Sequence, residues 1–343
     1  MGVKQLALWT DGPYREDALF NPSSSLNRDN CLSPFRVLKT KLSERGWDCH
    51  TQDVYKASGT APNSVLFLDI PGVPVGKLLG RWAGKSLSYV VLQECAVVKP
   101  GNWNTGSHMQ FDGIFTWDET LVDGKRYFKL NFSNHFPETI SAEYPAKDKL
   151  CVMIAGHKRK AHPLELYSER ENTIRWFEVN HPDDFDLYGI GWDRYAFTGP
   201  LFIRALNRIK PLTRLLGARF PSYRGAVTAK NPVMREYRFS ICYENAREIP
   251  GYITEKIFDS FFAGCVPVYW GAPDIAKHIP ENCFIDRRKF QNHEELYAFL
   301  KNMSEAEYMQ KLDAIRAFIT SPSAAPFSDR FFAETIANVV ANA

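Results

Sequence analysis

Short apolar segments alternate with stretches of helical periodicity along almost the whole chain of 343 residues. This alternation is the pattern of a parallel β-sheet covered by helices, because each parallel strand needs a crossover connection to bring the chain back. The fold class is therefore predicted to be α/β. Strands are expected at the apolar segments 5–10, 64–70, 89–94, 113–117 and 127–132 in the first half, and 150–155, 186–191, 237–243 and 265–270 in the second.

Helix signals lie between and after these strands. The first helix is expected to be capped by Ser33, to have Pro34 in its first turn and to end before Gly46. Further helices are expected at residues 164–179, 254–263, 293–302, 304–319 and 328–340.

A polar, proline-containing segment at residues 141–149 separates two such sets of elements, and it marks the expected domain boundary. The chain length also fits two domains of ordinary size better than one. We predict one α/β domain at residues 1–145 and a second at 146–320. Residues 321–343 form a terminal helix, for which packing back on the first domain is one option.

Composition excludes several other classes of protein. Apolar residues make up 45% of the chain, and the net charge of +3 is too small to attract nucleic acid through an overall field. Seven cysteines without a Cys-x-x-Cys pair favour reduced core residues over a disulfide framework or a zinc site. No segment has the roughly 18–20 apolar residues of a membrane span, and the first residues lack the apolar stretch of a signal peptide. We therefore expect a cytoplasmic protein.

The segment CYENAREIPGYITEK, residues 242–256, joins a strand to a helix through many hydrogen-bonding side chains. Ligands of open α/β sheets bind beyond the carboxyl ends of the strands, and the free N–H groups of a helix start suit a phosphate. Thr254 is placed to cap this helix, and Lys256 adds a full positive charge. Three further side chains are suited to sugar or ribose hydroxyls: Glu244, Asn245 and Glu255. The alternative is an ordinary helix start with a solvated Glu–Lys pair.

Residues 237–274, which include YRFSICYEN and GYITEKIFDSFFAGCVPVYWGAPD, resemble the donor-binding signature of the α1,3/1,4-fucosyltransferases, glycosyltransferase family 10. The resemblance is to the bacterial type without a transmembrane anchor. It extends to YRGAV (223–227) and LYSER (166–170), and more loosely to residues 92–103 and 111–121. It implies a glycosyltransferase-B fold, in which two Rossmann-like domains face a cleft. The acceptor would bind the N-terminal domain, and GDP-fucose would bind the C-terminal domain.

The resemblance also implies roles for single residues. Glu94, at the end of the strand 89–94, matches the position of the family's catalytic base. Lys256 and Tyr252 match contacts to the diphosphate, and Arg170 resembles the family's phosphate-binding arginine. Such a reaction needs a base, positive charge for the leaving diphosphate and a cleft that excludes water.

Each of these roles has a structural alternative. Glu94 can be a solvated strand end, and Arg170 can be a surface residue paired with one of its neighbours Glu165, Glu169 and Glu171. The run Lys158, Arg159 and Lys160 is a further, weaker candidate for phosphate contacts.

A metal site is poorly supported. The sequence Asp-Phe-Asp at residues 184–186 matches the Asp-x-Asp motif of another glycosyltransferase fold, but it precedes a strand instead of following one. The eight histidines show no metal-ligand spacing. Cationic side chains can replace a metal at a leaving diphosphate. We therefore expect no required cofactor, with GDP-fucose as a co-substrate and a divalent metal at most stimulatory.

Residues 194–235 contain nine Lys or Arg and no Asp or Glu. Within them, residues 200–220 interleave apolar and basic side chains, and Pro211 is expected to divide the segment into two short helices. Such a segment suits an anionic membrane surface, which would place the enzyme peripherally on the inner membrane. The alternative is a helical insertion whose apolar face packs on the C-terminal domain.

The sequence thus predicts an inverting fucosyltransferase that transfers L-fucose from GDP-fucose to a glycan hydroxyl, α1,3 or α1,4 to GlcNAc or Glc in a surface polysaccharide or lipopolysaccharide. Two alternatives stay open. The loop between Asn245 and Tyr252 is about one residue longer than in some bacterial members, so another GDP-deoxysugar can be the donor. A non-catalytic nucleotide- or glycan-binding relative is the second. The acceptor, the linkage and the oligomeric state are not determined by the sequence.

Overall fold

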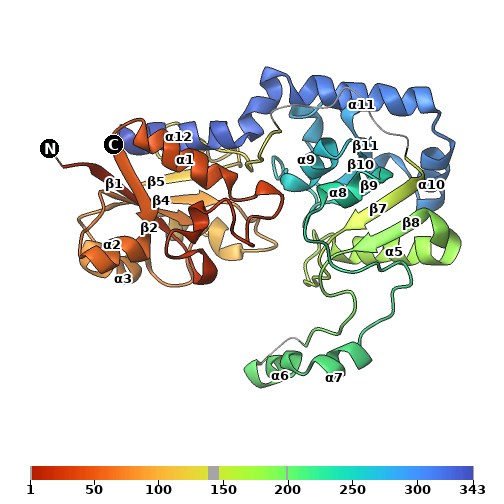
Figure 1. Ribbon diagram of the computed structural model, residues 1–343, viewed down its shortest axis with the longest axis horizontal. Helices are drawn as coiled ribbons and strands as arrows, with labels where there is room; N and C mark the ends of the chain where they lie inside the picture. The colour runs from red at the N-terminus through yellow and green to blue at the C-terminus, as the bar shows by residue number, and fades with distance from the viewer. Residues whose placement is uncertain (1, 138–146, 198–199, 343) are drawn as a thin grey trace.

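The computed structural model describes residues 2–137, 147–197 and 200–342. The predicted boundary between residues 145 and 146 lies outside these described residues. Two parallel β-sheets, each with helices around it, lie side by side along the long axis of the molecule (Figure 1). The predicted α/β class is confirmed.

The N-terminal sheet, within the described residues, has the order β2-β1-β3-β4-β5-β6, and all its neighbouring strands run parallel. Its central strands are almost completely buried because helices cover both faces, which explains their continuous apolar runs. The strands are β1 (Lys4–Trp9), β2 (Trp47–Thr51), β3 (Ser64–Leu68), β4 (Leu87–Leu92), β5 (Gly113–Thr116) and β6 (Tyr127–Lys129). The helices of this half are α1 (Ser33–Ser43), α2 (Gln52–Ser58), α3 (Val75–Leu79) and α4 (Thr105–His108).

The C-terminal sheet has the order β11-β10-β9-β7-β8 and is also parallel. Its strands are β7 (Lys149–Ile154), β8 (Phe185–Tyr188), β9 (Tyr237–Tyr243), β10 (Val266–Trp270) and β11 (Ile285–Asp286). The remaining helices are α5 (Tyr167–Asn180), α6 (Leu201–Ala205), α7 (Lys210–Leu215), α8 (Asn231–Met234), α9 (Glu255–Phe262), α10 (His293–Asn302), α11 (Glu305–Ile319) and α12 (Asp329–Ala341).

All nine predicted strands are present, with ends shifted by up to three residues. The sequence analysis missed β2 and β11. Strand β2, with the sequence WDCHT, lies at the sheet edge and buries only alternate residues, so it lacks an apolar run. Strand β11 has two residues and carries no pattern at all. Within the described ranges, every helix is too short or too polar to span a lipid bilayer.

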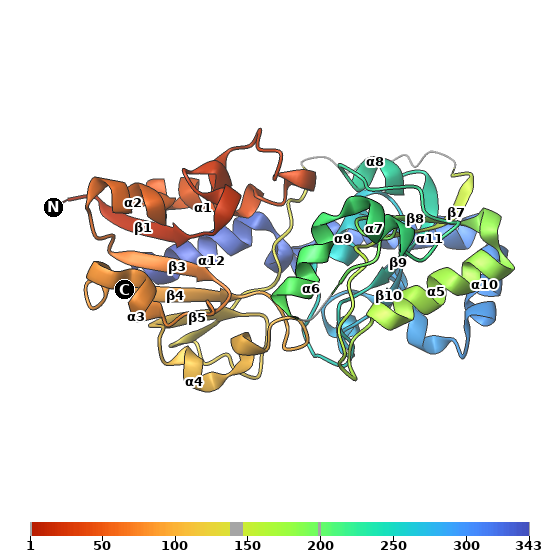
Figure 2. The same cartoon turned by 90° about the horizontal axis from the view of Figure 1, so that it is seen from below.

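Helix α12 returns from the C-terminal half and packs against α1 of the N-terminal domain (Figures 1 and 2). The rings of Phe35 and Phe332 meet edge to face at 5.9 Å, and both are buried. The prediction that Ser33 caps α1 is wrong: the cap position is Leu32, and the hydroxyl of Ser33 donates to Oδ2 of Asp329 at 2.6 Å. A buried hydroxyl at this contact thus connects the two helices instead of satisfying the helix end.

We expect Phe332→Ala to lower the free energy of unfolding by about 3–5 kcal/mol, because it leaves a cavity between α1 and α12. Urea unfolding followed by tryptophan fluorescence measures this loss. Arg330→Ala, on the exposed face of the same helix, is the matched control and should change stability by less than about 0.5 kcal/mol. Equal effects of the two substitutions would show that α12 is not anchored through its apolar face.

Candidate active site

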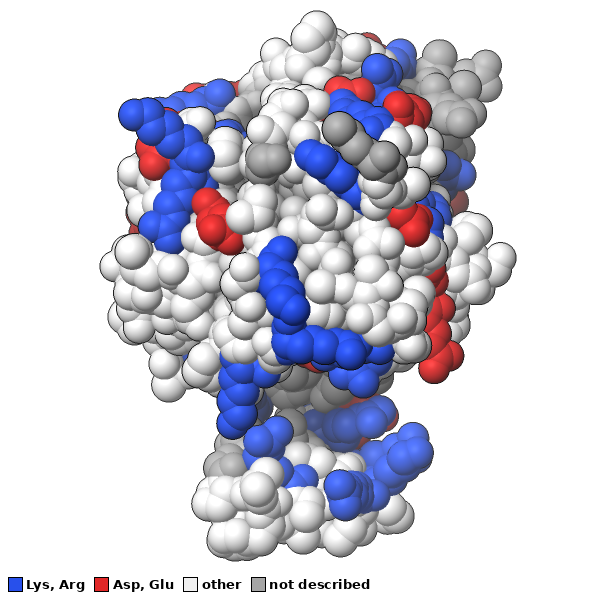
Figure 3. Space-filling view, turned by 90° about the vertical axis from the view of Figure 1, so that its left-hand side faces the viewer, with Lys and Arg blue, Asp and Glu red and all other residues white. Residues whose placement is uncertain are grey.

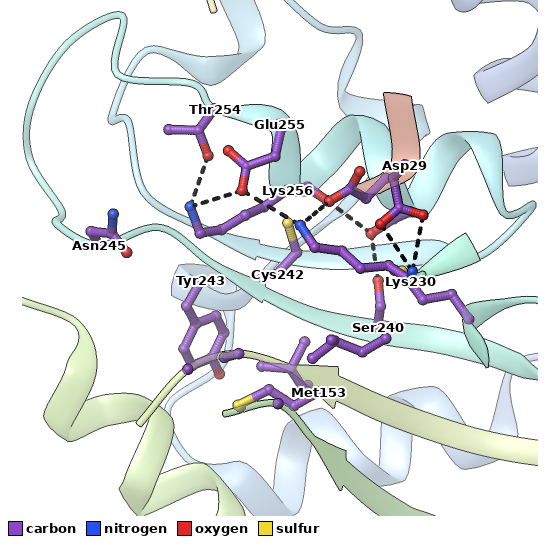
Figure 4. A pocket seen from close by; sticks show the side chains of 18 of the residues that line it. Asp29, Met153, Lys230, Ser240, Cys242, Tyr243, Asn245, Thr254, Glu255 and Lys256 are labelled. Carbon is purple, nitrogen blue, oxygen red and sulfur yellow. Dashed lines mark hydrogen bonds and ion pairs between the residues drawn. The ribbon is translucent and has the colours of Figure 1, made fainter. Parts of the chain in front are cut away.

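A cavity of about 470 Å³ lies where the carboxyl ends of the C-terminal strands face the N-terminal domain. The C-terminal domain supplies its floor through residues at or after the ends of β7, β8 and β9 and through the start of α9 (Figure 4). The N-terminal domain supplies five residues to the wall: Arg28, Asp29, Cys31, Glu94 and Phe132. The cavity therefore lies between two domains, in the place where open α/β sheets bind ligands.

Glu244 connects the end of β9 to the start of α9. Its side chain is fully buried, and its two carboxylate oxygens accept hydrogen bonds from the backbone N–H of Thr254 (2.8 Å) and from the Thr254 hydroxyl (2.7 Å). The carboxylate also pairs with Nζ of Lys256 at 3.1 Å. A Cβ at Gly271 would lie 2.5 Å from Cγ of Glu244, so only glycine leaves room for this carboxylate. Glu244 is not among the residues that line the cavity. It holds two residues that do, Thr254 and Lys256, and its predicted role as a sugar contact stays a prediction.

Thr254 occupies the N-cap position of α9, but its side chain does not cap the helix. The hydroxyl donates to Glu244 and accepts from the Lys256 ammonium group instead of from the first-turn N–H groups. The helix start therefore carries no side-chain cap, which leaves its first N–H groups without that acceptor, and Thr254, Glu255 and Lys256 of this start line the cavity.

Lys256 brings a positive charge to this edge. Its ammonium group lies 2.9 Å from the Thr254 hydroxyl and 3.8 Å from a carboxylate oxygen of Glu255. Burial opposes its charge, but the carboxylates of Glu244 and Glu255 outweigh this effect and raise the pKa of Lys256. The side chain is a stable cation at neutral pH and is held in one place by its partners.

Lys230 is a second cation of the cavity, which the sequence analysis did not single out. Its ammonium group pairs with Asp259 at 2.6 Å and with Glu255 at 3.6 Å. Its backbone N–H donates to both carboxylate oxygens of Asp29, each at 3.0 Å, so this position joins the two domains (Figure 4). No local motif marks Lys230; its contacts come from residues far away in the chain.

The pKa values of the two carboxyl groups beside Lys230, Glu255 and Asp259, are shifted in opposite directions. Burial opposes the charge of Glu255, but Lys256 and Lys230 lower the pKa of Glu255 to about 2. Burial and the charge of Glu255 raise the pKa of Asp259 to about 6 despite Lys230. Glu255 therefore stays ionised over the whole physiological pH range, whereas Asp259 takes up a proton at a higher pH than an ordinary aspartate.

Glu94 and Tyr252 meet across the domain interface. The Tyr252 hydroxyl donates to Oε2 of Glu94 at 3.2 Å, and both residues line the cavity. Burial and the carboxylate of Asp69 raise the pKa of Glu94, while Lys256 and the Tyr252 hydroxyl oppose this shift. The backbone carbonyl of Glu94 accepts from the Trp103 indole at 3.0 Å, which fixes the end of the strand. Glu94 is thus a positioned carboxylate in a cavity, not a solvated strand end.

Arg170 and Asn245 support the cavity wall beside Tyr252. One guanidinium nitrogen of Arg170 donates to the carbonyl of Tyr243 at 2.8 Å and to the Asn245 side chain at 3.1 Å. Asn245 in turn donates to the Tyr252 hydroxyl at 3.3 Å. Arg170 is 4% exposed and lines the cavity. It forms none of the surface ion pairs that were its structural alternative, since its partners lie at the end of β9.

Of the three weaker candidates for phosphate contacts, residues 158–160, only one faces the cavity. Lys158 lines the cavity, whereas Arg159 pairs with Glu171 at 3.5 Å and Lys160 donates to a backbone carbonyl. The loop at residues 246–251 does not line the cavity. It packs toward the N-terminal domain, where the ring centroid of the next residue, Tyr252, lies 5.2 Å from that of Trp117. The extra residue of this loop is therefore placed at the contact between the domains, not in the wall of the cavity.

The two aspartates of the Asp-Phe-Asp sequence have cationic partners. Asp184 pairs with Lys301 at 2.8 Å, and Asp186 pairs with Arg224 at 2.6 Å. Asp184 lies at the amino end of β8, whereas Gly189 beyond its carboxyl end lines the cavity. In the described part of the chain, no group of three His, Cys, Asp or Glu side chains is arranged to hold a metal.

Two parallel α/β domains with a cavity between them define the glycosyltransferase-B class. The crystal structure of an α1,3-fucosyltransferase with GDP-fucose has this fold, with a TM-score of 0.55, 15% identity, and coverage of 98% of this chain and 90% of that one. An α-glucosyltransferase in complex with UDP-glucose and DNA is as similar, with a TM-score of 0.58 at 9% identity and 99% coverage of both chains. The fold alone therefore does not select the donor.

Sequence comparison is more specific. Residues 204–313 match the model of the glycosyltransferase family 10 (fucosyltransferase) C-terminal region. The α-(1,3)-fucosyltransferase FucT of Helicobacter pylori is 37% identical over 139 residues, which are 36% of this chain and 28% of that enzyme. The chain thus matches less than a third of the length of this relative. Residues 204–313 thus match the same family that the resemblance in the sequence indicated.

We expect Glu244→Ala to lower the free energy of unfolding by about 2–3 kcal/mol, because the buried Thr254 N–H loses its acceptor and Lys256 loses its partner. Glu244→Gln should cost less, since its amide oxygen can still accept from Thr254. Urea unfolding without nucleotide measures both. Glu281→Ala breaks an exposed pair with Lys289 and is the control, with an expected change below about 1 kcal/mol. A loss no larger than in the control would contradict the anchoring role of Glu244.

Proposed function

We propose that this protein is an inverting fucosyltransferase, which transfers L-fucose from GDP-fucose to a hydroxyl group of a glycan. The match of residues 204–313 to the fucosyltransferase family model supports the reaction class. The single observation that carries the mechanism is that Glu94 of one domain and Lys256 of the other line the same cavity, with Tyr252 bonded to Glu94. A base and a cation on opposite sides of a bound sugar are what displacement at its anomeric carbon requires.

The step proceeds by direct displacement. The acceptor hydroxyl gives its proton to the carboxylate of Glu94, and its oxygen forms a bond to the anomeric carbon. The bond from that carbon to the β-phosphate oxygen breaks, and its electron pair leaves with GDP. Lys256 and the α9 N–H groups stabilise the charge on the diphosphate. Attack from the side opposite to the leaving group inverts the configuration.

The donor is proposed to be GDP-fucose because the match to the fucosyltransferase family model, residues 204–313, includes the cavity residues of β9 and α9. Another GDP-deoxysugar is the first alternative, and the donor pocket that would distinguish it includes Asn245 and Tyr252. A non-catalytic nucleotide- or glycan-binding relative is the second. The geometry around Glu94 favours catalysis, because a binding protein has no need of a carboxylate with a raised pKa in its cavity.

The acceptor is proposed to be GlcNAc or Glc in a surface polysaccharide or lipopolysaccharide, linked α1,3 or α1,4. The α1,3 activity in the name of the Helicobacter relative supports this choice. The protein would act in the cytoplasm. The expected membrane contact of residues 200–220 is a separate proposal, because the reaction in the cavity does not depend on it.

Glu94→Gln and Lys256→Met separate the two halves of the mechanism. Glu94→Gln should lower transfer from GDP-fucose roughly 10²–10⁴-fold and leave GDP affinity unchanged, because it removes only the base. Lys256→Met should weaken GDP binding roughly tenfold to a hundredfold through loss of a charge-assisted contact. Calorimetry with GDP and a glycan-array assay measure these effects, and Lys289→Met, an exposed lysine of the same domain, is the control. Wild-type protein that binds no GDP would refute the proposal.

The pH dependence of transfer should report Glu94. Its pKa is raised above the ordinary 4.5 by burial and Asp69, and the base acts only when deprotonated. The rate should therefore fall as pH decreases through this raised pKa, so the acid limb of kcat/KM lies above pH 4.5. Lys158→Gln removes a charge that lowers this pKa and should move the limb to higher pH. Lys160→Gln, two residues away, should not move it; equal shifts would exclude Glu94 as the titrating group.

Transfer is proposed to need no metal ion. Lys158, Lys230 and Lys256 line the cavity and can supply the positive charge that a metal gives elsewhere. We expect activity in excess EDTA to stay within about twofold of the untreated enzyme, measured by GDP release. Loss of activity that only added Mn²⁺ or Mg²⁺ restores would show that these cations are insufficient.

A further inference from the structure

Residues 200–219, called the arm below, project from the C-terminal domain (Figure 1). The arm contains α6 and α7, with a 3₁₀ turn at Leu206–Arg208 between them and Pro211 in the first turn of α7. The predicted division into two short helices is confirmed. The alternative prediction, that the apolar face packs on the C-terminal domain, is wrong, because the largest apolar side chains of the arm face solvent.

The base of the arm is firmly packed. Trp192 and Phe220, which flank it, are both buried and meet at 4.9 Å. The Tyr223 hydroxyl donates to the carbonyl of Gly189 at 2.8 Å. Gly189 and its neighbour Ile190 line the cavity. The base of the arm is therefore joined to the wall of the candidate active site through Tyr223 and Gly189.

The tip of the arm exposes an unusual amount of apolar surface. Leu201 is 80% exposed, Phe202 75% and Leu215 82%, and Ile209 and Leu216 are about half exposed. Single exposed apolar residues are ordinary, but five in a segment of sixteen residues mark an interaction surface. Water is a poor environment for this surface, so a partner that buries it stabilises the bound state.

Basic side chains accompany these apolar ones. Arg204, Arg208 and Lys210 are exposed and have no carboxylate within ion-pair distance in the described part of the chain. Arg214 reaches only Asp193, at 3.7 Å. Figure 3 shows the arm as a separate lobe on which basic side chains lie among residues that are neither basic nor acidic. The free positive charge indicates an anionic partner.

We propose that the arm docks on an anionic lipid bilayer, with its leucines and Phe202 among the acyl chains and its cations at the headgroups. The mixture of side chains selects this partner. Exposed leucines gain nothing on a nucleic acid, whose surface is polar and charged. A second copy of the arm would bring like charges together, since residues 194–235 have no acidic side chain. A bilayer satisfies both kinds of side chain at once.

Docking has a consequence that rests on the proposed function. Because the arm belongs to the same domain as Gly189 and Ile190 of the cavity wall, docking of the arm would keep the enzyme and its cavity at the lipid surface. An acceptor glycan anchored in that membrane would then reach Glu94 without leaving the bilayer. The arm itself takes no part in the chemistry, so soluble acceptors should not need it.

Vesicle sedimentation with the full chain tests the proposal. Wild-type protein should sediment with vesicles of 30% phosphatidylglycerol in phosphatidylcholine and stay in solution with phosphatidylcholine alone. The variant R204Q/R208Q/K210Q should bind about a hundredfold more weakly, because three cations near the surface are lost. The variant L201S/F202S/L215S should also lose binding, since it has no group to insert. K77Q/K85Q/K125Q removes three exposed lysines of the N-terminal domain and should bind like the wild type.

GDP binding by calorimetry confirms that each variant is folded, and transfer to a soluble acceptor should be unchanged in all of them. Failure of wild-type protein to sediment with anionic vesicles would overturn the proposal. So would arm variants that bind vesicles like the wild type, or arm variants that differ from it in oligomeric state without lipid, which would make the arm a contact between copies. Lipid binding by a protein that transfers no fucose would leave the arm's role intact and refute the proposed reaction instead.

Discussion

The buried carboxylate of Glu244 is the interaction on which the candidate site depends. It ends a buried strand, receives the N–H and the hydroxyl of Thr254, and pairs with Lys256. A buried charge is costly unless every lone pair is used, and here the donors come from the next helix. The same contacts orient the first turn of α9 and place Lys256 at the cavity edge. A negative charge that lines no cavity thus sets the position of the positive charge that does.

A second constraint is that the site is complete only when both domains are present. Glu94 bonds to Tyr252 across the interface, and Asp29 accepts from the backbone of Lys230 nearby. Far from the cavity, α12 returns to pack on α1. These three contacts hold the two sheets in one relative position. Since a base and a leaving-group cation must stand at opposite sides of one sugar, this geometry is a condition for displacement chemistry.

Apolar side chains are buried in the two domains but exposed on the arm. In the two sheets, apolar side chains are buried, and the cavity residues Lys230, Lys256 and Glu94 are paired or hydrogen-bonded. The arm does the reverse, with exposed leucines such as Leu201 and unpaired cations such as Arg204. Its base is nonetheless well packed at Trp192 and Phe220. A segment that is packed at its base and exposes apolar and basic side chains at its tip suits the membrane partner proposed above.

The sequence by itself determined the features that depend on neighbouring residues. The nine apolar strands, the strand–loop–helix unit at residues 237–262 and the division of the arm near Pro211 follow from local periodicity and turn chemistry. The sequence analysis missed edge strand β2 because alternate residues of this strand are polar and only partly buried. Only the tertiary structure decided which residues meet: Glu94 and Tyr252 are 158 positions apart, and Asp29 and Lys230 are 201 apart. It also brought Ser33 to Asp329, 296 positions away, and paired the buried carboxylate of Glu244 with Lys256. Such contacts depend on how whole sheets and helices pack, because local sequence fixes the type of each element but not its neighbours in space.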